Sequence, residues 1–233
     1  MSVVIPAWNE AERIGATIDR IRSDAHEVIV VDGGSRDGTR TVAYGKGARV
    51  LSAPPNRACQ MNVGAQAATG NVLLFLHADT LLPDRFAIDV QQTLLRKVIA
   101  GAFRFRLEGE RLAWRVVEWG TLWRFRLCRL PCGDQAIFLR TERFRAMGGF
   151  AVTPLMEDFE LMCRLRNCGR IRLARRAAVT SARRWIRLGV FRTTLINQLI
   201  VLGYRLGVSP DRLASLYRRP ELITGSVIEE PVE

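Results

Sequence analysis

The 233-residue sequence predicts an α/β fold built on a doubly wound, mostly parallel sheet. In the N-terminal half, short apolar runs alternate with segments whose apolar residues recur at helical spacing, which is typical of strand–helix–strand units. The apolar runs are continuous, as expected for strands that helices cover on both faces. Because ligands bind such sheets at the carboxyl ends of the strands, the residues after each strand are the first candidates for a site.

These patterns place each element of the N-terminal half. The opening apolar run at 3–5 predicts a buried strand, and Ile14, Ile18 and Ile21 give the segment 10–22 one apolar helical face. The next elements expected are a strand at 27–31, a helix at 39–44, a short strand at 49–51, a helix at 56–68 and a strand at 72–76.

The pattern loosens after Asp79. The segment 84–96 predicts a helix, and Phe103 alternates with Phe105 in a strand expected at 101–107. The segment 111–127 is aromatic and basic and receives no assignment. Further on we expect a strand at 135–139, a helix at 158–167 that Gly169 ends, and one or two amphipathic helices after Leu188.

Composition restricts the class of protein. The formal net charge of +12 comes mostly from arginine, and a basic surface attracts nucleic acid, anionic lipid or phosphorylated small molecules. No apolar run reaches the roughly 18 residues of a spanning helix. The five cysteines are an odd number, and the chain opens on a strand without a basic leader. We therefore expect free thiols and a cytoplasmic protein.

Two strand ends carry groups suited to a ligand. After the strand at 27–31, Asp32 can accept hydrogen bonds from a base or ribose, and Gly33 lets backbone approach a ligand closely. After the strand at 72–76, Asp79 follows His77 and would be poorly solvated unless it binds something such as a divalent cation on a diphosphate. The structural alternatives are a tight turn with helix caps in the first place and a capping aspartate in the second.

Two more clusters lie in the C-terminal half. Glu157, Asp158 and Glu160 fall at a predicted helix start, where acids either stabilise the helix dipole or remove a proton from an acceptor hydroxyl. The pair Arg183-Arg184 beside Trp185 suits diphosphate binding and stacking, or forms a solvated basic face.

With the opening segment Val4-Ile5-Pro6-Ala7-Trp8-Asn9-Glu10, these clusters resemble, in the same order, the family 2 glycosyltransferases over roughly residues 2–185. The resemblance implies a GT-A fold, a UDP- or GDP-sugar donor, Mg²⁺ or Mn²⁺ as cofactor, and transfer to a hydroxyl acceptor with inversion at the anomeric carbon. It implies donor binding by Pro6, Ala7, Glu10, Asp32, Gly33, His77, Arg183 and Arg184, a metal ligand in Asp79, a general base in Asp158, and an acceptor side formed by Gly133, Asp134, Gln135 and Trp185.

Two departures from the family pattern narrow the expectation. The metal motif of the family reads Asp-x-Asp, whereas this chain has His77 at its first position. The Gln-x-x-Arg-Trp motif of processive members lacks its glutamine, since Ser181 and Ala182 precede Arg183, so we do not expect polymer synthesis. The Leu-His-Ala-Asp-Thr and Arg-Arg-Trp signatures resemble a small bacterial subgroup of the family.

The chain is expected to have three parts: a GT-A catalytic domain over 1–185, a helical appendage over 186–220 and a loose acidic tail over 221–233. In the appendage, Leu195, Leu199, Leu202 and Leu206 form an apolar stripe edged by arginine. This stripe predicts contact with an anionic membrane, on the inner face of the cell membrane, and a lipid or lipid-linked acceptor. The alternative is packing on the core or in a homodimer.

Two other functions stay open at this point. A sugar-phosphate nucleotidyltransferase would want a glycine-rich basic loop after the first strand, where this chain has Pro6 to Glu10. A non-catalytic basic protein that binds membrane or nucleic acid would explain the arginines but not the acids at strand ends. Nucleic acid is therefore not an expected partner.

Overall fold

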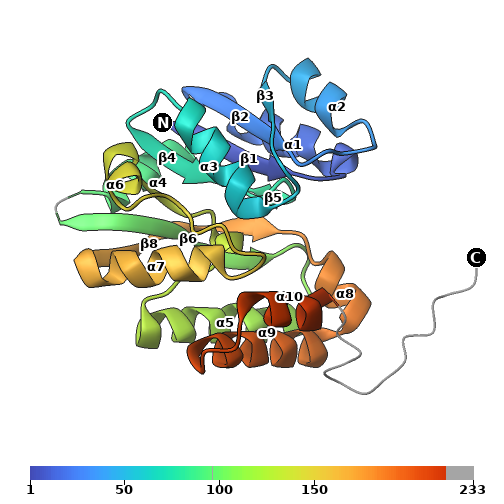
Figure 1. Ribbon diagram of the computed structural model, residues 1–233, viewed down its shortest axis with the longest axis vertical. Helices are drawn as coiled ribbons and strands as arrows, with labels where there is room; N and C mark the ends of the chain where they lie inside the picture. Colours follow the sequence, from blue (N-terminus) through green and yellow to red (C-terminus); the bar gives the residue numbers. More distant parts are fainter. Residues whose placement is uncertain (96, 219–233) are drawn as a thin grey trace, which may run out of the picture.

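The computed structural model describes residues 1–95 and 97–218, and it confirms the predicted α/β fold. The strands of the described residues form one eight-stranded sheet in the order β3-β2-β1-β4-β7-β6-β8-β5 (Figure 1). In chain order they are β1 (Ser2–Ala7), β2 (Glu27–Asp32), β3 (Arg49–Ser52), β4 (Val72–Phe75), β5 (Thr80–Leu81), β6 (Val98–Leu107), β7 (Phe138–Arg140) and β8 (Arg170–Thr180).

The N-terminal half of the sheet is parallel, as predicted. β1 lies between β2 and β4, with Val4 opposite both Ile29 and Phe75. The helices of this half are α1 (Ala11–Ile21), α2 (Thr39–Gly45), α3 (Arg57–Ala67) and α4 (Phe86–Thr93). α3 packs very closely on β1, because a Cβ added at Gly64 would meet a methyl group of Val4 at 2.3 Å. A side chain at this position would push the helix off the sheet.

The C-terminal half of the sheet is mixed. β7 runs antiparallel to β4 and β6, whereas β6 and β8 run parallel to each other. β8 had no counterpart in the sequence analysis. The strand expected at 135–139 is wrong in its first part: Gly133–Gln135 form a short 3₁₀ helix, η1, and β7 begins only at Phe138. The helix expected at 84–96 is shorter in the structure, since α4 ends at Thr93.

Helices form the remainder of the described chain. They are α5 (Leu112–Cys128), α6 (Thr141–Ala146), α7 (Glu157–Cys168), α8 (Arg183–Leu188), α9 (Val190–Arg205) and α10 (Pro210–Arg218). The two helices α9 and α10 confirm the expectation after Leu188, and the unassigned aromatic segment is α5. The acidic tail expected at 221–233 lies outside the described residues.

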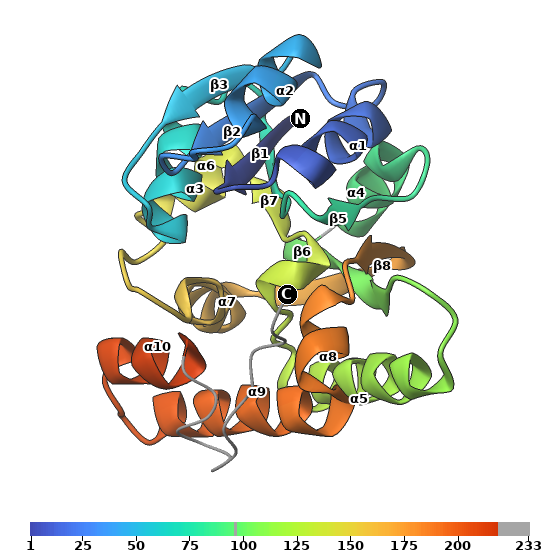
Figure 2. The same cartoon turned by 90° about the vertical axis from the view of Figure 1, so that its right-hand side faces the viewer.

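Two apolar clusters cover the two faces of the sheet. One contains the inner faces of α3, α6, α7, α9 and α10, and the other those of α1, α2 and α4. The predicted stripe of α9 faces away from both, because Leu195 is 40% and Leu206 is 75% exposed. The alternative that this stripe packs on the core of the chain is therefore wrong. α5 and α9 lie side by side at the end of the molecule opposite α2 (Figures 1 and 2).

Candidate active site

A cavity of about 350 Å³ opens where β1, β4 and β8 end. Its wall contains residues from the first and from the last elements of the described chain. Those that the sequence analysis selected are Pro6, Ala7, Glu10, His77, Asp79, Asp134, Arg183, Arg184 and Trp185. Those that it did not select include Arg57, Gln60 and Tyr217. The cavity therefore lies at the sheet edge where the α/β pattern predicts a ligand.

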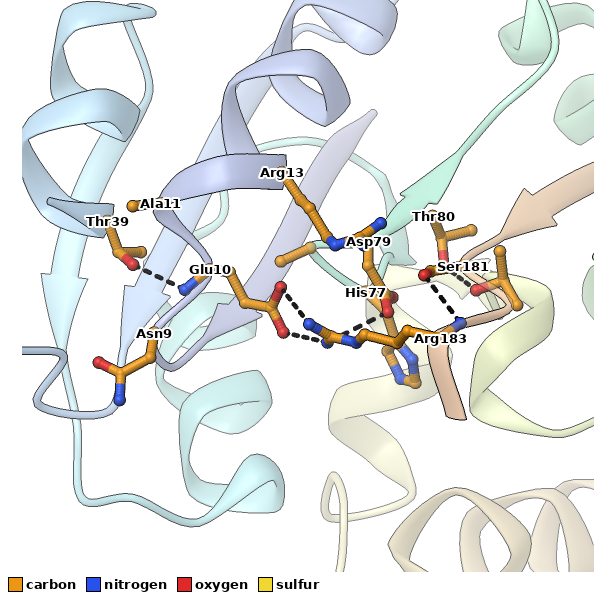
Figure 3. A network of polar contacts seen from close by, with 12 residues as sticks. Asn9, Glu10, Ala11, Arg13, Thr39, His77, Asp79, Thr80, Ser181 and Arg183 are labelled. Carbon is orange, nitrogen blue, oxygen red and sulfur yellow. Dashed lines mark hydrogen bonds and ion pairs between the residues drawn. The ribbon is translucent and has the colours of Figure 1, made fainter. Parts of the chain in front are cut away.

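Arg183 connects the ends of two strands across this cavity. Its guanidinium donates to both carboxylate oxygens of Glu10 and lies 3.2 Å from Asp79 Oδ2 (Figure 3). The hydrogen bond to Glu10 raises the pKa of Arg183. Asp79 precedes β5 rather than a helix, so the capping role that was its structural alternative is excluded. Two acids and one arginine thus face the same space.

Glu10 is held by the loop that follows β2. The Glu10 amide donates to Thr39 Oγ1 at 2.8 Å, and the Ala11 amide donates to Asp37 Oδ2 at 3.1 Å. Figure 3 shows Thr39 pointing at the chain beside Glu10. These bonds join the two predicted strand-end segments into one edge of the cavity.

Asp32 has a different place from the other candidates. It is only 1% exposed, and its carboxylate accepts the amides of Gly34 and Ser35 at 3.1 Å each. Asp32 and Gly33 are not among the residues that line the cavity in the described structure. Asp32 therefore shapes the loop after β2, at the side of the cavity.

Gln60 on α3 holds the ends of β1 and β2 together. Its side-chain amide donates to the carbonyls of Ala7 at 2.8 Å and Val31 at 3.0 Å. Gly33 leaves room for this amide, because a Cβ there would meet Gln60 Nε2 at 2.7 Å. The glycine after β2 thus serves a protein contact.

The 3₁₀ helix η1 joins His77 to the start of α7. Gly133 donates its amide to Asp158 Oδ2, and a Cβ at Gly133 would lie 3.1 Å from both that oxygen and His77 Nε2. His77 Nδ1 lies 3.2 Å from Asp134 Oδ1. Desolvation opposes the charge of Asp134, but the hydrogen bond and charge of His77, together with the charges of Arg57 and Arg124, outweigh it and lower the pKa of Asp134 to about 2. Asp134 is therefore an anion beside His77.

The side chain of Gln135 is used within the protein. It donates to the Phe103 carbonyl and accepts from the Cys132 amide, both at 3.0 Å. Gly133, Gln135 and Asp158 do not line the cavity among the described residues. Gln135 fixes the position of η1, whereas Asp134 reaches the cavity wall.

Glu157 and Asp158 are adjacent but differ in environment. Glu157 is buried, 3.6 Å from Arg57 Nη1, and burial together with the charge of Asp158 raises its pKa. Asp158 is half-buried, and its Oδ1 accepts the Phe159 amide at 2.7 Å. Burial opposes the charge of Arg57, but the surrounding carboxylates outweigh it and raise its pKa. Glu157 is thus matched with Arg57, whereas within residues 1–95 and 97–218 Asp158 has no arginine this close.

The last described helix closes the cavity. Arg184 lies over the ring of Tyr217 at 3.6 Å from its centroid, and both residues line the wall. Arg57 and Tyr217 were missed because nothing in their local sequence marks them: Arg57 only begins a helix after Asn56, and Tyr217 lies in the helices expected to be an appendage.

The donor atoms present fit a cation that is shared with a substrate. No three metal-ligating side chains cluster among the described residues, so a cage made of protein groups alone is absent from them. Asp79 supplies one carboxylate at the cavity wall, with His77 two residues earlier. One or two carboxylates plus substrate phosphates are the usual environment of Mg²⁺.

Comparison with known proteins agrees with this geometry. Residues 2–152 match the family model for glycosyl transferase family 2. Over 97 residues, the chain is 35% identical to glucosyl-3-phosphoglycerate synthase of Mycolicibacterium smegmatis, covering 36% of this chain and 32% of that protein. Over 112 residues, it is 33% identical to dolichyl-phosphate β-glucosyltransferase of Drosophila melanogaster, covering 39% of this chain and 34% of that protein. The match thus spans about a third of each relative's length.

The fold also matches solved structures. The Mycobacterium tuberculosis glucosyl-3-phosphoglycerate synthase, solved with Mn²⁺, uridine diphosphate and phosphoglyceric acid, superposes with a TM-score of 0.61 at 21% identity. The superposition covers 89% of this chain and 78% of that one. The same enzyme with Mg²⁺ and uridine diphosphate gives a TM-score of 0.61 at 22% identity, covering 89% and 79%. At these identities the likeness shows the fold.

Proposed function

The chain belongs to glycosyl transferase family 2, and from this premise we propose that it transfers a sugar from a nucleoside-diphosphate sugar to a hydroxyl acceptor with inversion. Its GT-A fold, predicted from the sequence, is confirmed by its structural neighbours. The observation that carries the proposal is the meeting of Glu10, Asp79 and Arg183 at the wall of one cavity. UDP is the first donor nucleotide to test, because it is bound in the structural neighbours, and GDP is the second.

The donor would bind across the ends of β1 and β2. Pro6 and Ala7 supply backbone and apolar surface for the nucleoside, and Arg183 and Arg184 supply cations for the diphosphate. Arginine suits this task because its planar fork can donate two hydrogen bonds to one phosphate group. A non-catalytic basic protein would have no need for acids between these arginines.

Asp79, with His77 beside it, would hold a divalent cation such as Mg²⁺ or Mn²⁺. When bound, the cation supplies positive charge that stabilises the leaving diphosphate. Arg183 carries out part of the same neutralisation from the protein side, since it lies 3.2 Å from Asp79. The chain therefore offers a carboxylate for the metal and an arginine for the phosphate at one place.

The proposed reaction is a single displacement. Asp158 accepts the proton of the acceptor hydroxyl, the acceptor oxygen bonds to the sugar C1, and the bond from C1 to the diphosphate oxygen breaks. The electron pair of that bond leaves with the nucleoside diphosphate, and one displacement inverts the anomeric carbon. The Gly133 amide orients the carboxylate of Asp158 by donating to one of its oxygens. The acceptor needs only a hydroxyl group, free or on a lipid.

A thermal-shift assay tests the proposal. UDP with Mn²⁺ should raise the melting temperature of the wild type, because a ligand that binds only the folded state stabilises it by mass action. Asp79→Asn should melt within about 5 °C of the wild type without ligands, because it loses one partly exposed ion pair, and it should lose the additional effect of Mn²⁺. The exposed Asp84→Asn, which replaces an acid paired with Arg20, is the matched control and should respond like the wild type. If neither UDP nor GDP with Mn²⁺ stabilises the wild type, a nucleotide-sugar donor is ruled out.

A further inference from the structure

A second apolar stripe, which the sequence analysis did not identify, lies on α5. Its members are Leu112, Val116, Trp119, Trp123 and Leu127. The exposed Phe191 extends the stripe already predicted on α9, which then consists of Phe191, Leu195, Leu199, Leu202 and Leu206. Together they make up ten of the seventeen large hydrophobic side chains that are exposed in the described residues. Such a concentration on two helices marks an interaction surface.

The two helices are neighbours, and we call the surface formed by their two stripes the α5/α9 face. On α5 the stripe lies opposite the buried Trp114, and on α9 it lies on the side away from Ile196 and Ile200, at 100° per residue. The two helices contact each other at the end of the molecule (Figures 1 and 2). Each helix therefore packs inward with one side and presents its stripe outward.

The charges on these helices are almost all positive. α9 contains no acid, and α5 contains only Glu118, which accepts the Leu107 amide and pairs with Arg115. Besides Arg183 at the cavity, four arginines are exposed on α5, α8 and α9, namely Arg115, Arg126, Arg187 and Arg205. Two copies of these helices packed together would bring positive charge against positive charge, because α5 and α9 carry a single acid between them and Arg115 pairs with it. An anionic lipid headgroup complements the arginines, so the charge favours a membrane over a second copy.

The aromatic side chains also suit a lipid–water boundary. Trp119 and Trp123 meet edge to face at 5.6 Å between ring centroids, and Arg126 lies 5.5 Å from the Trp123 ring. Tryptophan and arginine are typical of helices that lie in the plane of a membrane surface. No helix of the described chain is long and apolar enough to cross a membrane.

The two helices of the α5/α9 face contact the candidate active site with their inner sides. Trp185, which lines the cavity, packs in a small cluster with Trp114 and Val117 of α5 and Val190 of α9. A second cavity of about 240 Å³ is lined by Trp119 of this face and by Gln135, next to Asp134. Trp119 thus belongs both to the α5/α9 face and to a cavity that contains Gln135 of the acceptor side.

We propose that the α5/α9 face docks on an anionic lipid bilayer, with the apolar stripes in the interfacial layer and the arginines on the headgroups. The docking stands independently of catalysis. Its consequence for substrate choice, an acceptor hydroxyl on a lipid in the same membrane, rests on the proposed glycosyl transfer.

Vesicle flotation of the full chain tests the docking. Vesicles of equal parts phosphatidylglycerol and phosphatidylcholine should carry the protein at low salt, and vesicles of phosphatidylcholine alone should carry much less. Binding should weaken as salt rises, because charge attraction is screened within about 10 Å at 0.1 M salt.

Paired variants separate the surface from the fold. Leu127→Ser with Phe191→Ser removes two side chains that are 78% and 82% exposed, and should weaken vesicle binding by at least about tenfold. Tyr44→Ser with Leu95→Ser removes two comparably exposed side chains elsewhere, 78% and 61%, and should bind vesicles like the wild type. Both variants should keep the thermal shift with UDP and Mn²⁺. This shift reports donor binding separately from vesicle binding, so loss of one can be told from loss of the other.

Two results would overturn the docking. One is absence of wild-type binding to the anionic vesicles at low salt. The other is a dimer, measured by light scattering, that the Leu127→Ser and Phe191→Ser pair converts to a monomer, since this would assign the α5/α9 face to a second copy of the chain.

Discussion

The ion pair between Arg183 and Asp79 should make two ligands respond in opposite directions to one substitution. In Arg183→Gln, the carboxylate of Asp79 loses a cation at 3.2 Å. The side chain of Asp79 is 18% exposed and that of Arg183 is 50% exposed. We therefore use a water-like dielectric constant of about 80, which gives an interaction energy of about 1.3 kcal/mol at this distance. A divalent cation no longer competes with the guanidinium. Mn²⁺ alone should therefore bind about tenfold tighter.

Binding of UDP without metal should change in the other direction. Arg183 would supply a charged hydrogen bond to the diphosphate, and loss of such a bond costs on the order of 1.5–3 kcal/mol. UDP in the presence of a chelator should therefore bind roughly 10- to 100-fold more weakly to Arg183→Gln. Titration calorimetry measures both affinities on the same preparation. Arg187→Gln, an exposed arginine on the same helix, is the control and should leave both unchanged.

The sign of the Mn²⁺ effect decides the matter. If Arg183→Gln binds Mn²⁺ no better than the wild type, Arg183 does not compete with the metal ion for the carboxylate of Asp79. Equal weakening of Mn²⁺ and UDP would instead mean that the substitution disorders the cavity wall.

Three further changes test other parts of the site and the fold. Asp158→Asn should lower turnover by about 10²- to 10⁴-fold and keep the affinity for UDP. Donor turnover and calorimetry measure these two quantities. An active Asp158→Asn variant beside an inactive Glu157→Gln variant would show that Glu157 is the base. Asp32→Asn should lower the free energy of unfolding, measured by urea denaturation, by about 1–3 kcal/mol, because the loop amides lose a charged acceptor. The same variant should bind UDP more weakly. Unchanged stability and affinity would refute this role of Asp32. Partial burial opposes the charge of Glu27, but hydrogen bonds led by that of Ser2 lower its pKa from 4.5 to about 2. Glu27→Gln should therefore cost about 1–2 kcal/mol at pH 7, allowing for solvent screening, and this difference should fade as the pH falls from 4.5 to about 2; a pH-independent cost would contradict the assignment.

The parallel half of the sheet could be predicted because β1, β2 and β4 each contain a continuous apolar run. β8 could not, since Arg170, Arg172, Arg175 and Arg176 interrupt its pattern. Arg175 and Arg176 are both exposed although they are neighbours, and the pairing of β6 with β8 shifts register between Ala102 and Arg104. An irregularity of this kind breaks the alternation by which a half-exposed strand is identified.

The strand ends of the candidate site could also be predicted, because the topology itself brings them together. Asp79 and Glu10 follow directly from that rule. Arg57 and Tyr217 could not be found, because they reach the cavity through the packing of α3 and α10, which no local pattern encodes. The loop contact of Asp32 could not be predicted either: its carboxylate accepts the amides of Gly34 and Ser35, which no sequence pattern reveals.

The bond between Glu10 and Arg183 joins residues 173 positions apart in the chain. During synthesis, the four parallel strands and their helices leave the ribosome long before α8 does. The nascent N-terminal half therefore carries Glu10 and Asp79 before their arginine partner has been made. The ion pairs of Arg183 with Glu10 and Asp79 can form only after α8 has been made. A chain terminated after β7 would keep Glu10 and Asp79 but lack Arg183 and Arg184, two of the cations at the cavity wall.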